Sequence, residues 1–377
     1  MQLKRTITLA LAGVVNAQNP SLSDALNAQN SSLSTLNGLL QSTGLGGQLS
    51  QLSNVTILAP NNDALSALLN NSDAAARLAD NSALAALLNY HILNGTHYAD
   101  AFGNTSAFLP TYLTNQSYTS VTGGQRVEAR TSDGNVTFFS ALKQNATVVT
   151  ANLNFTGGVI HIVDGVLNIP SNLTTTLSNA NLTAAAGAIN TANLEGTLGG
   201  LRDITVFAPN NDAFNDIGSV LANISTEDLG TVLGYHVVEN HVAYSSDLQN
   251  STLTATNGDK LTISVINGTV YVNAARVTVP DILISNGVVH VINQVLNSDN
   301  STATPDTTGT GPAYSGASSG TAGVPYTSGV ATPTTTFPAA TSGGTAATST
   351  SNPGMPMKTA AVGMGALFGG AAMLANF

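Results

Sequence analysis

The segment Val55-Thr-Ile-Leu-Ala-Pro-Asn-Asn-Asp-Ala-Leu65 recurs further along the chain as Ile204-Thr-Val-Phe-Ala-Pro-Asn-Asn-Asp-Ala-Phe214. Two more segments recur in the same order, with 88–92 returning as 233–237 and 158–163 returning as 287–292. A repeat this long, present twice, indicates a duplicated globular domain rather than a solenoid of short repeats.

The second copy is shorter than the first. The spacing between matching segments falls from about 149 residues to 145 and then to 129. The first copy has extra length at 94–118, which predicts a longer surface loop. We place the copies at 19–170 and 171–298, with so few residues between them that the two domains are expected to touch.

Each copy mixes helices and strands. Residues 55–59 predict a strand, which leads through a turn into a helix at 64–69, and Ser82 is expected to open another helix. Alternating apolar residues across 121–150 predict strands joined by hairpins. Residues 158–166 are apolar on both faces, which is typical of a central buried strand. Each copy is therefore predicted to be an α+β domain, with a sheet or sandwich packed against helices.

Composition narrows the classes of function. Of the 377 residues, 42% are hydrophobic and only 8% are charged, and cysteine is absent, which excludes disulfides and cysteine-based sites. The net charge of -10 argues against a nucleic-acid partner, which requires a basic surface. About fifteen Asn-x-Ser/Thr sequons predict a surface hydrated by N-linked sugar instead, with candidate sites at Asn54, Asn70, Asn94, Asn104, Asn115, Asn135, Asn145, Asn172, Asn223, Asn250 and Asn267.

The N-terminus has the pattern of a secretory signal. Lys4 and Arg5 precede the apolar stretch 6–15, and small residues follow up to Ala17. This order predicts a signal peptide at 1–17 that is removed on secretion. The protein is then expected outside the cell, with the vacuole as the alternative destination.

The C-terminus has the pattern of a lipid-anchor signal. Residues 299–351 are rich in Ser, Thr, Gly and Pro and predict an extended, disordered, O-glycosylated stalk. Small residues around Ser349 precede a short polar spacer, and an apolar tail ends the chain. We expect 352–377 to be a glycosylphosphatidylinositol (GPI) signal, with attachment at Ser349 and membrane contact through the lipid.

The three repeated segments, in this order, resemble the fasciclin domain. Residues 58–65 and 207–214 match the family's strand that ends in an Ala-Pro-x-x-x-Ala-Phe type of turn. The family's Tyr-His pair and its His-containing third motif are matched by Tyr90-His91 and Tyr235-His236, and by 157–167 and 286–296. The resemblance covers 19–298. It implies a wedge or β-sandwich packed with helices, and a role in adhesion or matrix organisation.

The resemblance also suggests one candidate adhesion motif. A Pro-Asp-Ile segment before the third motif is linked to integrin contact in animal members, and the second copy has Pro280, Asp281 and Ile282 there. The first copy has Ala151-Asn-Leu-Asn154 at the same place, so the motif is not repeated. We therefore favour a structural role for Asp281.

Four histidines recur in both copies, namely His91 and His161 in the first and His236 and His290 in the second. A zinc site needs three or four ligands, and each copy offers two histidines and one nearby carboxylate, Asp63 or Asp212. The spacing of Leu84, Leu87, Leu88 and His91 puts this histidine on the apolar face of a helix. We interpret all four histidines as buried structural residues, with metal binding and catalysis as the alternatives.

Asp63 and Asp212 follow Pro-Asn-Asn and come before apolar helix starts, so we interpret them as helix caps rather than catalytic acids. No second carboxylate recurs at a fixed distance to complete a glycosidase pair.

The predicted function is non-enzymatic, with no cofactor, and consists of adhesion or of organising the cell wall or matrix. The expected partners are cell-wall polysaccharide, a matrix protein or another copy of the same chain. A secreted hydrolase or metal-dependent enzyme, and a vacuolar component of membrane turnover, are the alternatives.

Overall fold

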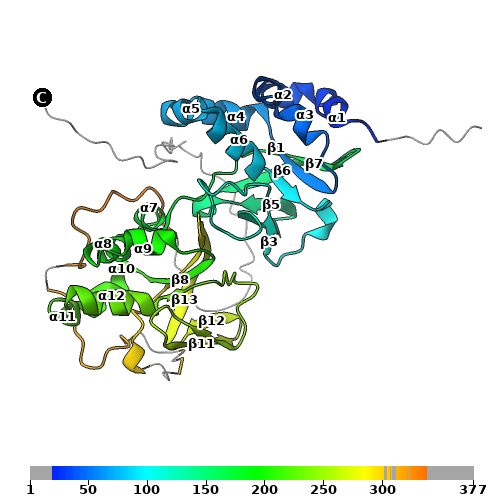
Figure 1. Ribbon diagram of the computed structural model, residues 1–377. Coiled ribbons are helices and arrows are strands. Elements are labelled where there is room, and N and C mark those ends of the chain that lie inside the picture. Colours follow the sequence, from blue (N-terminus) through cyan, green and yellow to red (C-terminus); the bar gives the residue numbers. More distant parts are fainter. Residues whose placement is uncertain (1–18, 301–303, 306, 308–310, 322, 338–377) are drawn as a thin grey trace, which may run out of the picture.

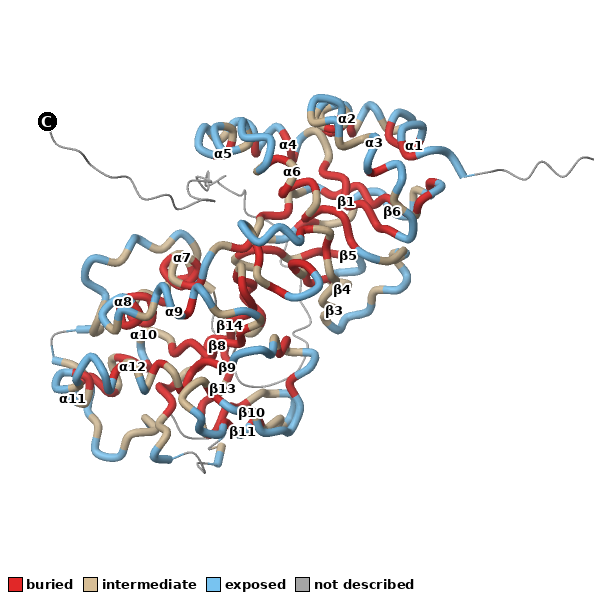
Figure 2. Tube along the Cα trace, in the orientation of Figure 1, coloured by how far each residue is buried: buried red, intermediate tan, exposed pale blue. Residues whose placement is uncertain are grey.

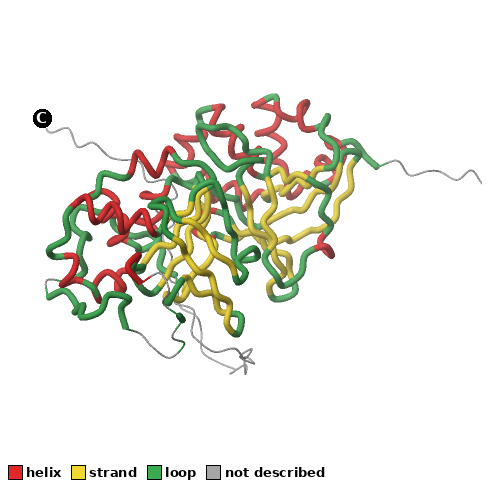
Figure 3. Tube along the Cα trace, turned by 60° about the horizontal axis from the view of Figure 1, so that its bottom comes forward, coloured by secondary structure: helices red, strands yellow, loops and turns green. Residues whose placement is uncertain are grey.

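The computed structural model describes residues 19–300, 304–305, 307, 311–321 and 323–337, and shows two domains side by side (Figure 1). Each domain contains one seven-stranded sheet. Figure 3 shows the strands of each domain gathered apart from its helices. The prediction of two α+β domains is therefore confirmed.

The first domain begins with helices and ends with a hairpin-rich sheet. Its helices are α1 (Leu22–Ala28), α2 (Asn30–Thr43), α3 (Leu45–Leu49), α4 (Asn62–Leu69), α5 (Ser72–Leu78) and α6 (Asn81–Tyr90). Its strands are β1 (Val55–Pro60), β2 (Ile92–Asn94), β3 (Ala107–Pro110), β4 (Arg126–Ser132), β5 (Asn135–Phe139), β6 (Asn145–Phe155) and β7 (Gly158–Val163). The strand order across the sheet is β2-β1-β7-β6-β5-β4-β3.

The second domain repeats this plan. Its helices are α7 (Leu173–Asn179), α8 (Thr183–Thr191), α9 (Glu195–Gly200), α10 (Asn211–Asp216), α11 (Gly218–Leu221) and α12 (Thr226–Tyr235). Its strands are β8 (Ile204–Pro209), β9 (Val237–Val238), β10 (Ser251–Thr254), β11 (Lys260–Ile266), β12 (Thr269–Val272), β13 (Ala275–Ile284) and β14 (Gly287–Ile292). The strand order, β10-β11-β12-β13-β14-β8-β9, matches that of the first domain.

The repeated segments form the centre of each sheet. Strand β1 runs parallel to β7, with Val55 opposite Gly158, and β8 runs parallel to β14 in the same register. Figure 2 shows burial concentrated on these strands and on the inward faces of the helices. The central strand expected at 158–166 is buried, but it ends at Val163, because the chain turns away there into a bend.

The two domains touch through the extra length of the first copy. Residues 111–125, between β3 and β4, are longer than their counterpart 255–259, and they lie against the second domain. The backbone N–H of Ser120 donates to the carbonyl of Ser285 at 2.8 Å, and the side-chain Nε2 of Gln125 donates to the carbonyl of Ile284 at 3.0 Å. The extra length of the first copy, predicted as a longer surface loop at 94–118, therefore lies mainly at 111–125. Residues 94–118 contain β3 and lead into the segment that docks on the other domain.

The chain after the second domain returns to it. Residues 311–321 and 323–337, here called the C-terminal strap, run along the helices of the second domain (orange in Figure 1). Six of its apolar side chains pack against the core beneath these helices, and they are Tyr314, Ala317, Val324, Tyr326, Val330 and Phe337. The expected extended stalk is therefore absent from the described part of 299–351, because aromatic and branched side chains find an apolar face to cover.

A close approach of two backbones explains the glycine at the start of each third motif. A Cβ on Gly287 would overlap the carbonyl oxygen of Ile204 on the parallel neighbour strand. We expect Gly287→Ala to lower the free energy of unfolding by roughly 1–3 kcal/mol, the usual effect of overpacking. Urea denaturation would measure it.

The matched control is Gly230→Ala, in the middle of α12, where a Cβ meets no atom within 4 Å. This change should leave stability equal or raise it by up to about 1 kcal/mol, because alanine favours the helix more than glycine. Equal stability of the two variants would show that the strands are not in such close contact.

Candidate functional site

His91 and His236 connect a helix end to the segment after the central strand. His91 ends α6, is buried, and donates from Nδ1 to the carbonyl of Leu87 at 2.8 Å. Its Nε2 accepts the N–H of Leu167 at 2.9 Å. His236 makes the same two bonds, to the carbonyl of Val232 at 2.7 Å and from the N–H of Leu296 at 2.9 Å. Both ring nitrogens of each histidine are therefore used within the protein.

His161 and His290 perform a similar task on the central strands. Each is fully buried, and Nε2 donates to a carbonyl, that of His97 at 2.8 Å or that of Ala243 at 2.8 Å. Each Nδ1 accepts a backbone N–H from the neighbouring strand, at 3.3 Å. Burial lowers the pKa of both rings, so both are neutral at pH 7.

The tyrosines before two of these histidines are anchored as well. Tyr90 is buried and its hydroxyl donates to the carbonyl of Arg126 at 2.9 Å. Tyr235 donates to the carbonyl of Lys260 at 2.8 Å. Burial raises the pKa of both hydroxyls. The Tyr-His pair thus fixes the end of a helix to the sheet in each domain.

The helix caps are the asparagines, not the aspartates. Asn61 Oδ1 accepts the N–H of Ala64 at 2.8 Å, and Asn210 does the same for Ala213. Asp63 and Asp212 lie exposed in the first turn, so the cap prediction for them is wrong. The side-chain oxygen of an asparagine just before a helix, in the extended conformation, can accept an N–H two or three residues further along the chain. The side chain of a residue already inside the helix cannot.

The second asparagine of each Pro-Asn-Asn has a role that sequence reasoning missed. Asn62 Oδ1 accepts the N–H of Thr35 at 2.9 Å, and its Nδ2 donates to the carbonyl of Ser31 at 3.1 Å. Asn211 binds the start of α8 in the same way, through Ala184 and Asn181. The sequence signal for this role was that both asparagines of Pro-Asn-Asn recur in the two copies, not only the first one.

Asp281 is part of the interior. It is buried, with a left-handed φ of 63°, and its Oδ1 accepts the N–H of Ser245 at 2.8 Å. Ile282 is also buried, while Pro280 is half-buried. The first copy places Asn152 at the matching point, with φ 62° and its Oδ1 accepting the N–H of Ala99 at 2.9 Å. The candidate adhesion motif is therefore not an exposed loop, and Asp281 serves the fold.

A buried ion pair lies where the domains meet. Glu128 is buried and pairs with Lys143 at 3.1 Å. The same ammonium donates to the carbonyls of Pro280 at 3.0 Å and Asp281 at 3.4 Å in the second domain. Lys143 and Leu142 both have left-handed φ values, near 53° and 52°, a strained arrangement that holds the ammonium at this point.

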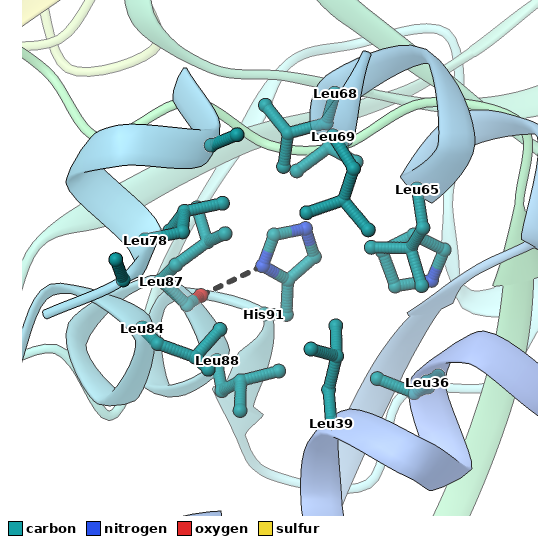
Figure 4. A pocket seen from close by; sticks show the side chains of 14 residues that line it. Leu36, Leu39, Leu65, Leu68, Leu69, Leu78, Leu84, Leu87, Leu88 and His91 are labelled. Carbon is teal, nitrogen blue, oxygen red and sulfur yellow. Dashed lines mark hydrogen bonds between the residues drawn. The ribbon is translucent and has the colours of Figure 1, made fainter. Parts of the chain in front are cut away.

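A cavity of about 170 Å³ opens between α2, α4, α5 and α6 of the first domain (Figure 4). Its walls are leucine, alanine, valine and proline side chains, and His91 is the one polar residue that lines it. Both nitrogens of His91 are occupied, as shown above. The cavity can therefore receive an apolar group but offers no free acid or base.

Within the described ranges, three or more His, Cys, Asp or Glu side chains nowhere gather in a way that could hold a metal ion. None of the described helices combines the length and hydrophobicity that crossing a bilayer requires.

The two copies define a tandem α+β domain protein whose repeated motifs serve the fold. The sequence matches the Fasciclin domain family at 31–170 and 180–298, so the chain belongs to the fasciclin family. It is 35% identical to a fasciclin-like arabinogalactan protein of Arthroderma benhamiae, across 78% of this chain and 72% of that one. It is 32% identical to another fasciclin-like arabinogalactan protein, from Phaeosphaeria nodorum, across 78% of this chain and 93% of that one.

A solved structure, the FAS1 domain pair of the insect cell adhesion molecule Fasciclin I, is 19% identical. The match covers 73% of this chain and 99% of that one, with a TM-score of 0.35.

The neutral histidines predict a loss of stability in acid. Burial lowers the pKa of His236 to about 4 from 6.5, so between these pH values the unfolded chain takes up a proton that the folded chain does not. The free energy of unfolding should fall over this window by up to about 3 kcal/mol for this residue. His236→Gln should be less stable at pH 7 but lose less on acidification, as urea unfolding at pH 7, 5.5 and 4.5 would measure.

The control is the exposed His241, whose replacement by Gln should preserve the full pH dependence. The same dependence in His236→Gln as in the wild type would contradict a buried neutral ring.

Removing Lys143 should weaken the contact between the domains. Lys143→Met removes the nearer of the two cations beside the buried Glu128, since Arg130 Nε lies 3.9 Å from its other oxygen, and this should cost up to about 3 kcal/mol of stability. Adding Glu128→Gln should restore part of that loss, because the unpaired charge is then gone. Urea unfolding of the single and double variants measures both effects, and equal stability of the two would show that the pair is not coupled.

Proposed function

We propose that this protein is a non-enzymatic glycoprotein of the cell surface that acts in adhesion or in organising the cell wall. One observation carries the proposal: the four histidines that both copies share are committed to internal hydrogen bonds. His91, His161, His236 and His290 each use both ring nitrogens on backbone groups. A general acid or base needs a free nitrogen within reach of substrate. Family membership supports the same conclusion.

The surface of the domains suits a sugar-coated protein. The eleven candidate asparagines from Asn54 to Asn267 are all exposed. Sugar is attached to the Nδ2 atom of asparagine. The side-chain oxygen Oδ1, not Nδ2, makes the hydrogen bonds of Asn54, Asn115, Asn172 and Asn250. Glycans would hydrate a surface that carries few charges.

The proposed location rests on the two ends of the chain, which lie outside the described residues. Residues 1–17 have the signal-peptide pattern, and 352–377 with Ser349 have the GPI pattern. Between the end of the strap at Phe337 and Ser349 only a short linker remains. The lipid would therefore hold the two domains within a few tens of ångströms of the membrane, since an extended chain spans about 3.5 Å per residue.

The partners that we propose are cell-wall polysaccharide, a matrix protein or a second copy. Two linked domains with a fixed contact between them could present one continuous surface. Weak contacts by each domain would then combine through avidity.

Deleting the gene should reduce the adhesion of cells to each other and to a surface, and the full chain should restore it. A chain ending at residue 350 is the matched control, because it keeps both domains and the strap but lacks 351–377. It should appear in the medium and fail to restore adhesion of the cells that secrete it. Phospholipase C specific for phosphatidylinositol should release the full-length protein from intact cells.

Normal adhesion and wall integrity in the deletion strain would overturn the proposed function. Location of the tagged protein in the vacuole, with the tag placed after Ala17, would overturn the proposed site of action.

A further inference from the structure

The second domain shows how a peptide can dock on this fold. Tyr326 of the strap lies over α8 and α10, with its ring edge-on to Phe214 at 6.4 Å between centroids and 84° between planes. Its carbonyl oxygen is so near Gly187 that a Cβ there would overlap it. Ser219 N–H donates to the carbonyl of Ser318 at 3.0 Å, and Gly320 N–H donates to that of Asn215 at 2.9 Å. At this point the strap is thus held by backbone bonds and by the aromatic side chain of Tyr326.

Among the residues that the structure describes, none covers the matching glycine of the first domain. Gly38 on α2 corresponds to Gly187, and Leu65 on α4 corresponds to Phe214, at the same spacing of about 149 residues. Gly38 is exposed, and a Cβ placed on it meets no atom within 4 Å. Leu69, at the rim of the cavity, leaves 37% of its surface exposed, among the few large apolar side chains that are exposed in the described residues.

Gly38 serves no purpose inside the first domain. It lies in the interior of a 14-residue helix, where glycine is less favourable than alanine, and its φ is not left-handed. In the second domain the corresponding glycine allows a peptide backbone to lie against the helix. The absence of a side chain at Gly38 leaves the same space on α2, and the next residue, Leu39, lines the cavity.

The cavity that Leu39 and Leu65 line has the size of one ring. Its volume of about 170 Å³ is close to the roughly 150 Å³ of an apolar cavity that holds benzene. Figure 4 shows leucine side chains from α2, α4 and α6 around it, with the bond from His91 to Leu87 directed to the protein itself. An occupant would therefore gain apolar contact but no polar bond from these walls.

We propose that this groove of the first domain, between α2 and α4, binds an extended peptide of another protein that presents an aromatic side chain beside proline or glycine. The chemistry is that of Val324-Pro-Tyr326 in the strap. Leu69 stands where the second domain has Gly218, which the strap passes closely at Gly320. The peptide would therefore cross α2 and α4 without following the rest of the strap's path.

The chain's own strap is not the occupant, because it is already docked on the second domain. The inference deepens the proposed adhesion function, on which it rests for the presence of a partner. The inference is tested by binding in solution. A negative result would leave the proposed adhesion function intact, because another surface could provide it. A positive result would not by itself establish adhesion.

The probe is a synthetic peptide of residues 319–331, labelled with a fluorophore, titrated with the full secreted protein and followed by fluorescence anisotropy. A matched peptide carries Tyr326→Ser. The blocking variant is Gly38→Gln, which adds a long side chain on an exposed helix position without disturbing the core. The control variant is Gly47→Gln, at another exposed glycine with no atom within 4 Å of a Cβ and no part in the cavity.

The expected result is saturable binding of one peptide to the wild type and to Gly47→Gln. Binding should be weaker by about tenfold or more for Gly38→Gln, and for the Tyr326→Ser peptide, as is usual when the central aromatic contact is lost. A second variant, Ala75→Leu, narrows the cavity from α5 and should also weaken binding. Circular dichroism confirms that each variant is folded.

Absence of saturable binding to the wild type would overturn the inference, and so would binding that Gly38→Gln leaves unchanged, which would place the peptide elsewhere. Self-association of the wild type in sedimentation, abolished by Gly38→Gln, would assign the groove to a second copy and overturn the choice of an external partner.

Discussion

The parallel pairing of the first and last motif strands is the constraint on which each domain depends. Strand β1 lies beside β7, and β8 beside β14, although the paired residues Val55 and Gly158 are 103 positions apart in the chain and Ile204 and Gly287 are 83 apart. The pairing brings a carbonyl so close to Gly158 and Gly287 that no side chain fits there. The chain between the two strands forms helices and the five other strands of the same sheet, of which β2 pairs with β1 and β6 pairs with β7 in the first domain.

The recurring histidines solve a problem that the closure creates. Buried segments that are neither helix nor strand leave backbone groups without partners, and an unpaired buried group is costly. The rings of His91 and His236 each donate to a carbonyl in the last turn of a helix and accept an N–H of the segment after the central strand, so each joins these two parts of the chain. A ring that must do both has to stay neutral, and burial ensures this. Recurrence of a reactive residue type in this duplicated chain thus records a structural requirement.

The main differences between the copies are contacts between segments that lie far apart in the sequence. Residues 111–125 of the first copy bind carbonyls at the hairpin between β13 and β14, and Lys143 brings a buried charge to the same boundary. The strap covers the helices of the second domain but leaves the equivalent face of the first domain open. The two domains are therefore in direct contact and have unequal faces, although they repeat one sequence pattern.

The sequence by itself determined the duplication, the α+β class, the inward histidines and the family, because each depends on local order or on spacing along one strand or helix. It also located the turn at Pro-Asn-Asn, but it assigned the cap to Asp63 rather than Asn61, since that choice depends on a single backbone angle. Only the tertiary structure decided that residues 111–125 dock, that Asp281 is interior and that the strap returns. Those outcomes depend on which surfaces meet in the folded chain. The composition of 299–351, rich in Ser, Thr and Gly, predicted a stalk, although its few aromatic residues pack against an apolar face of the second domain.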